Sequence, residues 1–260
     1  MTQQLFNLKG RVALITGGNG GIGLGMAEGL ASQGCDVCIW GTNPAKNAAA
    51  LDRLKSFGTQ VSAIQCDVAD ATAVAASFAR TLATHGRVDG CFANAGIGGR
   101  GTAFDEMTDA EWHRIIDVNL HGVFHTFRAA ARHMRERAAQ GDAFGRLIGT
   151  ASLAAISGQA RGEHYAATKG GLVSMMKALA VEYARYGVTA NSILPGWIET
   201  DMTEGAMSNP KFVSNVMQRI PSRRWGQAAD FAGIAVYLMS AASSYHSADT
   251  FLIDGGYAAF

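Results

Sequence analysis

A tyrosine and a lysine four positions apart give this chain its clearest chemical signal. In the run Tyr-Ala-Ala-Thr-Lys, Tyr165 and Lys169 lie one turn apart on the same face if the segment is helical. A free tyrosine has a pKa of about 10 and exchanges protons poorly at neutral pH, but a neighbouring ammonium group favours the phenolate. We therefore expect Lys169 to lower the pKa of Tyr165, which would make the phenol a general acid and base.

A serine upstream of this pair could complete a catalytic group. Ser152 follows the apolar run 147–151, so it would stand at the rim of a buried strand. Its hydroxyl could donate a hydrogen bond to a carbonyl oxygen as negative charge develops there. Taken one at a time, Ser152 could be a turn residue, Tyr165 an interface aromatic and Lys169 a surface charge. All three together favour a catalytic role.

A glycine-rich turn near the start of the chain predicts a dinucleotide site. Gly17, Gly21 and Gly23 follow an apolar run and open a helical segment, and Asn19 and Ile22 belong to the same turn. The missing side chains let the backbone approach a diphosphate, and the helix N-terminus offers free N–H groups. With the catalytic group, this turn predicts hydride transfer with a bound NAD or NADP.

The choice between NAD and NADP depends on the end of the second expected strand, about 20 residues after the glycine turn. Gly41 and Thr42 occupy this place, so neither an acid for a ribose diol nor an arginine for a 2′-phosphate is present. Lys46 could reach a phosphate but is expected to be solvated. The absence of a well-placed cation favours NAD, with use of both nucleotides left open.

Short apolar runs alternate with longer helical segments along the chain, which predicts parallel β-α units and a doubly wound, Rossmann-type α/β sheet with helices on both faces. Residues 1–260 are expected to form one domain, with 195–226 as a flap over the substrate. Helices are expected to begin near Gly21, Pro44, Asp70, Asp109, Glu163 and Gln227. Strands are expected at 11–16, 36–40, 60–65, 88–93, 145–150, 188–194 and 250–253.

Composition restricts the possible partners. The 260 residues are 48% hydrophobic and carry a formal net charge of +1, which gives no electrostatic footprint for nucleic acid or a membrane surface. We expect a cytoplasmic protein with a small-molecule partner. Cys35 and Cys38 have the spacing of a redox or zinc pair, but their segment reads as a buried strand, and no metal site is expected. The arginines of 128–137 are expected on a solvated helix face.

Several motifs, in their order and spacing, resemble those of the short-chain dehydrogenase/reductase family over essentially the whole chain. One departure is Ala93, where the family usually has asparagine. Within the family the chain most resembles sugar-acid dehydrogenases of the gluconate and deoxygluconate type and 3-oxoacyl carrier-protein reductases. The motifs are Thr-Gly-x-x-x-Gly-x-Gly at 16–23, Cys66-Asp67-Val68, Ala93-Asn94-Ala95-Gly96, Asn119, Ser152, Tyr165 with Lys169, Pro195-Gly196 and Asp254-Gly255-Gly256.

The resemblance implies roles for these positions. Asp67 and Val68 would border the adenine, and Asn119 would hold a water that connects Lys169 to solvent. Lys169 would also hold the nicotinamide ribose. The remaining cofactor contacts that it implies are Asn94, Ala95, Gly96, Tyr165, Pro195, Gly196, Ile198 and Thr200. The family analogy also implies a homotetramer or dimer.

The expected reaction is the NAD(P)-dependent interconversion of a secondary alcohol and a ketone on a sugar acid or polyol. A 3-oxoacyl thioester substrate and a non-catalytic dinucleotide sensor are the alternatives, and a sensor would be expected to lack one of the three catalytic residues. The expected substrate contacts, beside Ser152, are Leu153, Gln159, His164, Trp197 and Met202. His164 is equally well explained as a packed or interface side chain.

Overall fold

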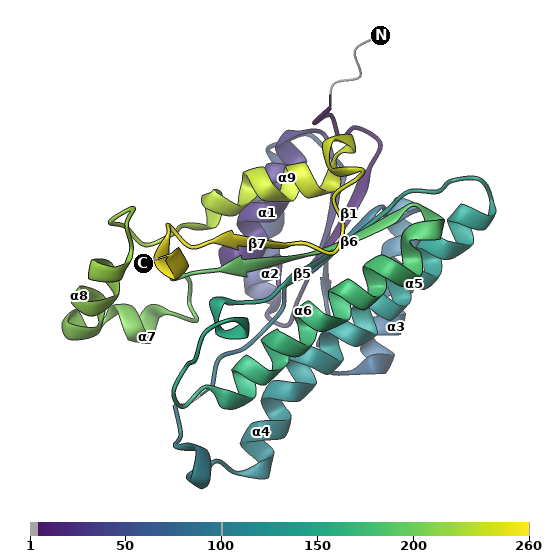
Figure 1. Ribbon diagram of the computed structural model, residues 1–260. Coiled ribbons are helices and arrows are strands. Elements are labelled where there is room, and N and C mark those ends of the chain that lie inside the picture. Colours follow the sequence, from purple (N-terminus) through teal and green to yellow (C-terminus); the bar gives the residue numbers. More distant parts are fainter. Residues whose placement is uncertain (1–4, 100, 260) are drawn as a thin grey trace.

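The computed structural model describes residues 5–99 and 101–259 and is built around one parallel sheet of seven strands. Their order is β3-β2-β1-β4-β5-β6-β7, the doubly wound Rossmann-type arrangement that the sequence predicts (Figure 1). Each predicted strand is found, with its ends shifted by at most two residues. The strands are β1 (Val12–Thr16), β2 (Asp36–Gly41), β3 (Val61–Gln65), β4 (Gly90–Ala93), β5 (Gly145–Thr150), β6 (Val188–Pro195) and β7 (Thr250–Ile253).

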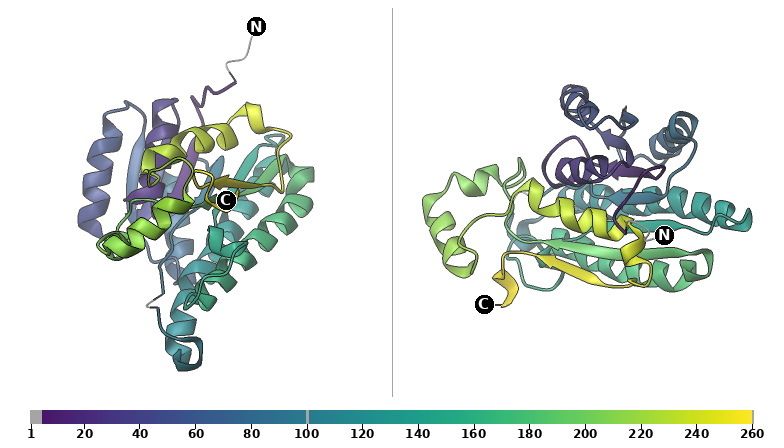
Figure 2. Two further views of the ribbon diagram at one scale, coloured as in Figure 1. Left: turned by 60° about the vertical axis from the view of Figure 1, so that its left-hand side comes forward. Right: turned by 90° about the horizontal axis from the view of Figure 1, so that it is seen from above.

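Alternate residues of strands β1 to β6 enter two different cores. In β1, Leu14 packs on one face of the sheet, whereas Ala13 and Ile15 pack on the other. The face of Leu14 is covered by α3 (Ala71–His85), α5 (Gly122–Ala139) and α6 (Glu163–Tyr183). The opposite face is covered by α1 (Gly21–Ser32), α2 (Pro44–Lys55) and α9 (Ala232–Met239), so the sheet is buried on both sides (Figures 1 and 2).

Side-chain caps define where several helices begin. The side chains of Asn43 and Asp70 accept backbone N–H groups of α2 and α3, and Thr108 accepts the N–H of Glu111 at 3.2 Å. Thr108 thereby starts α4 (Asp109–Ile116), as its spacing to Glu111 predicts. The last predicted helix differs slightly, because a short 3₁₀ turn at Ala228–Phe231 precedes α9.

The helical region after Asp109 differs from the sequence-based expectation at two places. A π-helical turn at Asp117–His121 separates α4 from α5, where an extra residue widens the helix and turns Asn119 inward. The expected solvated face of 128–137 is also wrong for Arg137, which is only 9% exposed and binds the buried Asp89 at 2.9 Å.

The long connection after β6 carries two short helices, α7 (Glu204–Met207) and α8 (Pro210–Arg219). Both stand apart from the main helical layers, near the C-terminus (Figures 1 and 2). They have a small core of their own around Val216, Ile220 and Trp225. Within the described part of the chain, no helix is both long and apolar enough to cross a membrane.

Candidate active site

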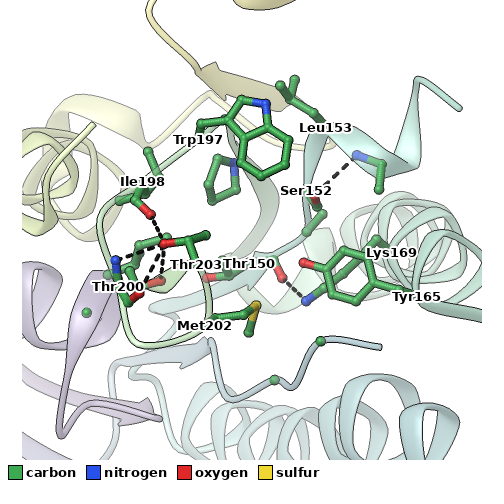
Figure 3. Close-up of a pocket in the computed structure, with 18 of the residues that line it drawn as sticks. Thr150, Ser152, Leu153, Tyr165, Lys169, Trp197, Ile198, Thr200, Met202 and Thr203 are labelled. Carbon is green, nitrogen blue, oxygen red and sulfur yellow. Dashed lines mark hydrogen bonds between the residues drawn. The ribbon is translucent and has the colours of Figure 1, made fainter. Parts of the chain in front are cut away.

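A cavity of about 570 Å³ opens at the carboxyl ends of the central strands. It lies where the strand order reverses, because β1 continues to β2 on one side and pairs with β4 on the other. Its lining comes from the glycine turn before α1, the segments after β4, β5 and β6, the start of α6, and Tyr257 near the C-terminus. Figure 3 shows its catalytic half.

The glycine turn forms a cradle that side chains would fill. Gly17 has a φ of 63°, a left-handed conformation that favours glycine. A Cβ atom at Gly23 would stand 2.3 Å from the carbonyl oxygen of Gly17, so this close approach also requires glycine. Asn94 fixes the neighbouring strand end by donating to the carbonyl of Thr16 at 3.1 Å. A backbone cradle at the start of α1 fits the diphosphate of a nicotinamide dinucleotide.

Helix α6 brings Tyr165 and Lys169 into the cavity, as their spacing predicts. Lys169 is only 3% exposed, and its Nζ donates to the carbonyl oxygen of Thr150 at 2.8 Å. The same Nζ lies 5.5 Å from the centre of the Tyr165 ring, and the phenol points into the cavity beside it (Figure 3). The hydrogen bond to β5 therefore fixes the ammonium group next to the phenol.

The expected lowering of the Tyr165 pKa is wrong for this structure. Burial raises the pKa of Tyr165 above its usual value, and the hydroxyl of Ser152 lowers it only in part. Burial also lowers the pKa of Lys169 to about 8. Both groups are desolvated, which disfavours both charged forms, and this effect outweighs the attraction that sequence spacing suggests.

Ser152 is oriented as a hydrogen-bond donor. Its Oγ accepts the backbone N–H of Ala154 at 3.2 Å and so starts a short 3₁₀ turn at Leu153–Ala155. This contact uses an acceptor lone pair of the hydroxyl and leaves its proton free. Ser152 and Tyr165 line the same part of the cavity, where both hydroxyls can meet one substrate oxygen (Figure 3).

The Asn119 side chain holds the segment that follows β4. Asn119 is fully buried, and its side chain accepts the N–H of Ile97 at 2.8 Å and donates to the carbonyl of Ile97 at 2.9 Å. Both amide groups thus hold the segment after β4. This contact places Gly96 beside Lys169, and a Cβ atom at Gly96 would lie 3.5 Å from the Lys169 Nζ.

The turn after β6 closes the other side of the cavity. Thr203 donates from its Oγ1 to the carbonyl of Ile198 at 2.6 Å and accepts the N–H of Thr200 at 3.1 Å. These bonds fix the turn that carries Trp197 and Met202, which face the cavity from opposite sides (Figure 3). Both residues are among the predicted substrate contacts.

Most predicted site residues line this one cavity, but seven do not. Gly41 lies beneath the side chains of Asn19 and Asn47, and Val68 packs against Gly122. His164 is fully buried behind Gly99, so the structure does not place it in the cavity. The seven residues outside the lining are Gly23, Gly41, Thr42, Asp67, Val68, Asn119 and His164.

Two further residues line the cavity. Lys46 is exposed, as expected, and its Nζ also pairs with the exposed Asp201 at 2.5 Å between α2 and the turn after β6. Tyr257 reaches the cavity from the C-terminal segment. Neither position carries a local sequence signal, because each contact joins elements far apart along the chain.

Comparisons with known proteins find related enzymes along the whole chain. A family model described as Enoyl-(Acyl carrier protein) reductase matches residues 17–258. The chain is 32% identical to 2-dehydro-3-deoxy-D-gluconate 5-dehydrogenase of Escherichia coli (100% of each chain). It is 34% identical to 3-oxoacyl-(acyl-carrier-protein) reductase of Chlamydia pneumoniae (96% of this chain, 97% of that one). It is 37% identical to levodione reductase of Leifsonia aquatica (96% and 94%).

Solved structures give the same result. A short-chain type dehydrogenase/reductase from Mycobacterium marinum superimposes with a TM-score of 0.91 at 33% identity, covering 97% of both chains. Gluconate 5-dehydrogenase from Burkholderia cenocepacia, solved with NADP and tartrate, gives a TM-score of 0.92 at 35% identity over 98% of both chains. A relative with bound NADP gives no support to the preference for NAD that the sequence suggested.

Proposed function

The chain belongs to the short-chain dehydrogenase/reductase family, and from this premise we propose that Tyr165, Ser152 and Lys169 catalyse its reaction. The protein is an NAD(P)-dependent oxidoreductase that interconverts a secondary alcohol and a ketone. The observation that carries our assignment is the convergence of the Ser152 and Tyr165 hydroxyls on one cavity, beside the Lys169 ammonium group and the glycine cradle.

The three side chains divide the proton chemistry between them. A bound nicotinamide dinucleotide supplies or accepts the hydride. In ketone reduction, Ser152 and Tyr165 donate hydrogen bonds to the carbonyl oxygen, and the phenol proton passes to this oxygen as the alcohol forms. Burial keeps the phenol protonated at neutral pH, which suits an acid. The Lys169 ammonium then stabilises the phenolate until solvent returns the proton.

The substitution Tyr165→Phe tests the proton donor. We expect turnover to fall by about 10²- to 10⁴-fold, because the ring remains while the proton is lost. The dissociation constant of the nucleotide, measured by its fluorescence, should change little. Tyr183→Phe, on the same helix, is the matched control. Turnover by Tyr165→Phe within about tenfold of the parent enzyme would remove Tyr165 from the mechanism.

For the cofactor, we propose that both NADP and NAD bind, with Lys46 as the group that responds to the 2′-phosphate. The two positions at the end of β2 are Gly41 and Thr42. Neither is acidic, so neither repels a phosphate. Lys46 lies in the first turn of α2 and lines the cavity. Because Lys46 is paired with Asp201, its ammonium group is less available to the 2′-phosphate, and the preference for NADP over NAD is reduced.

The family relationship alone leaves the substrate open, because relatives are named for deoxygluconate, 3-oxoacyl carrier-protein and levodione. A non-catalytic sensor is disfavoured, because Ser152, Tyr165 and Lys169 are all present and share one cavity. We further propose that residues 1–260 act as one domain in which 195–226 forms a flap over the substrate.

Assembly and location complete the proposal. We propose a homotetramer or dimer formed through α5, α6 and their neighbours, which expose Phe104, Phe124 and Val181. Light scattering measures the number of copies directly. We also propose a cytoplasmic location. The four cysteines are buried and form no disulfide, which is usual for proteins of a reducing compartment.

A further inference from the structure

Apolar side chains dominate the half of the cavity beyond Ser152 and Tyr165. We call Leu153, Trp197, Met202, Ala206 and Tyr257 the substrate wall, since all five line the cavity and none is an aspartate, glutamate, lysine, arginine or histidine. In Figure 3, Trp197 and Leu153 stand on one side of the catalytic hydroxyls and Met202 stands on the other. A substrate carbonyl that reaches Ser152 and Tyr165 must therefore lie among these groups.

The aromatic part of this wall is held in place. The Trp197 ring meets Phe212 edge-on, with 5.0 Å between ring centres, and Trp225 in the same manner at 5.6 Å. Trp225 is only 7% exposed and belongs to the small core of the flap region. The bracing fixes an apolar face beside the reacting carbonyl before any substrate arrives.

The nearby cations already have partners. Lys169 is bound to the carbonyl of Thr150, and Lys46 is paired with Asp201 at the cofactor end. Arg219 donates to the Tyr257 hydroxyl at 2.8 Å, lies over its ring, and does not line the cavity. Across residues 5–99 and 101–259, the cationic side chains of the lining are Lys46, at the cofactor end, and Lys169, which is bonded to β5 beside the catalytic phenol, so neither belongs to the substrate wall.

Few neutral polar groups remain for a polyhydroxylated substrate. The Ser157 hydroxyl donates to the Leu153 carbonyl at 2.9 Å, so its proton is used. Gln159 lines the cavity with an exposed side chain, so its amide is one neutral polar group that can still bind a substrate. Sugar hydroxyls placed against the substrate wall would lose water without gaining partners, which is unfavourable.

We propose that the natural substrate is an uncharged, mainly apolar ketone with at most one further polar group, rather than a sugar acid. The inference rests on the proposed function, since the carbonyl must reach Ser152 and Tyr165. A carboxylate held against Leu153, Trp197 and the half-exposed Met202 would lose part of its hydration without gaining a counter-ion. The negative diphosphate of the cofactor in the same cavity adds repulsion.

A matched pair of cyclic ketones tests the inference. We would compare 4-oxocyclohexanecarboxylate with its methyl ester, which share one skeleton and differ in charge. We expect kcat/KM for the ester to exceed that for the acid by at least about 100-fold, because a desolvated, unpaired carboxylate is strongly disfavoured. Equal values, or a preference for the acid, would overturn the proposal.

A designed cation provides the reciprocal test. Met202→Arg places a guanidinium group on the substrate wall, and we expect it to raise the acid-to-ester ratio of kcat/KM by at least about tenfold. Met202→Gln, a neutral polar change of similar length, should leave this ratio near that of the parent enzyme. If the parent already prefers the acid and Arg219→Gln removes the preference, Arg219 is a carboxylate ligand and the proposal is wrong.

Binding separates the substrate class from the reaction. Quenching of tryptophan fluorescence measures the affinity of both compounds for the complex of enzyme and NADP. Tighter binding of the ester without any turnover would refute the proposed oxidoreductase role of the three catalytic residues while supporting the neutral pocket. Equal or tighter binding of the acid would overturn the substrate class even if Tyr165→Phe removes all activity.

Discussion

Burial, more than sequence spacing, sets the protonation of the catalytic residues. Tyr165 and Lys169 are adjacent on α6, and both are removed from water. Desolvation raises the pKa of the phenol and lowers that of the ammonium to about 8. The pair is therefore held as a neutral acid beside a cation that loses its proton readily. This arrangement favours activity at the expense of stability, because a charged lysine is buried.

Lys169→Met should stabilise the fold while removing turnover. The folded pKa of about 8 lies below the unfolded value of 10.5, so the unfolded state binds the proton more tightly. Burying the ammonium thus costs about 3 kcal/mol below pH 8, and this loss fades as pH rises from 8 to 10.5. Part of the gain at neutral pH is offset by the lost bond to Thr150.

Denaturant unfolding of parent and variant at about pH 7 and about pH 10 measures this difference. The stabilising effect of Lys169→Met should be largest at the lower pH, and subtraction cancels groups common to both proteins, such as the buried cysteines. Lys177→Met, an exposed position on the same helix, should show no such dependence. A difference that is constant with pH would mean that Lys169 is not desolvated.

At the scale of elements, the sequence predicted the strands and helix starts that depend on residues close together in the chain. The strand 36–41 is buried without a break from residue 37 onward, and Thr108 with Glu111 is a helix start that needs only one turn of chain. The π turn at 117–121 and the pairing of Lys46 with Asp201 could not be predicted in this way. The turn is stabilised by the contact of Asn119 with Ile97, and the pair joins residues 155 apart in sequence.

The pairing of α2 with the turn after β6 carries the prediction about cofactor choice. Lys46→Met should weaken NADPH binding by about tenfold and leave NADH binding nearly unchanged, because one charge-assisted contact to the 2′-phosphate is lost. Asp201→Asn should strengthen NADPH binding by freeing Lys46. Nucleotide fluorescence gives both dissociation constants, and Lys55→Met on α2 is the control. Equal weakening of both nucleotides would place Lys46 at the shared diphosphate.

At the scale of the whole molecule, the catalytic cavity and a buried ion-pair cluster lie at opposite ends of the sheet. The cavity lies at the carboxyl ends of the strands, whereas Asp89 stands at their amino ends, just before β4. Asp89 is fully buried and binds Arg11, Arg87 and Arg137, at 2.9 Å for Arg137. It also accepts the backbone N–H of Val12 at 2.9 Å, so one carboxylate joins β1, β4 and α5.

Asp89→Asn should therefore destabilise the protein without changing its chemistry. Removing the charge leaves Arg11 without a carboxylate partner and leaves the buried Arg137 and the part-buried Arg87 with only the 43% exposed Asp142, so we expect a loss of about 3–5 kcal/mol in the free energy of unfolding. Asp142→Asn, which removes a partner that is 43% exposed, should cost no more than about 1 kcal/mol.

Denaturant unfolding measures both losses, and kcat of the folded variants should match the parent because the active site lies at the opposite end of the sheet. Equal losses for the two variants would show that Asp89 is not the point that holds these elements together, and a fall in kcat for Asp89→Asn alone would show that the two ends of the sheet are coupled.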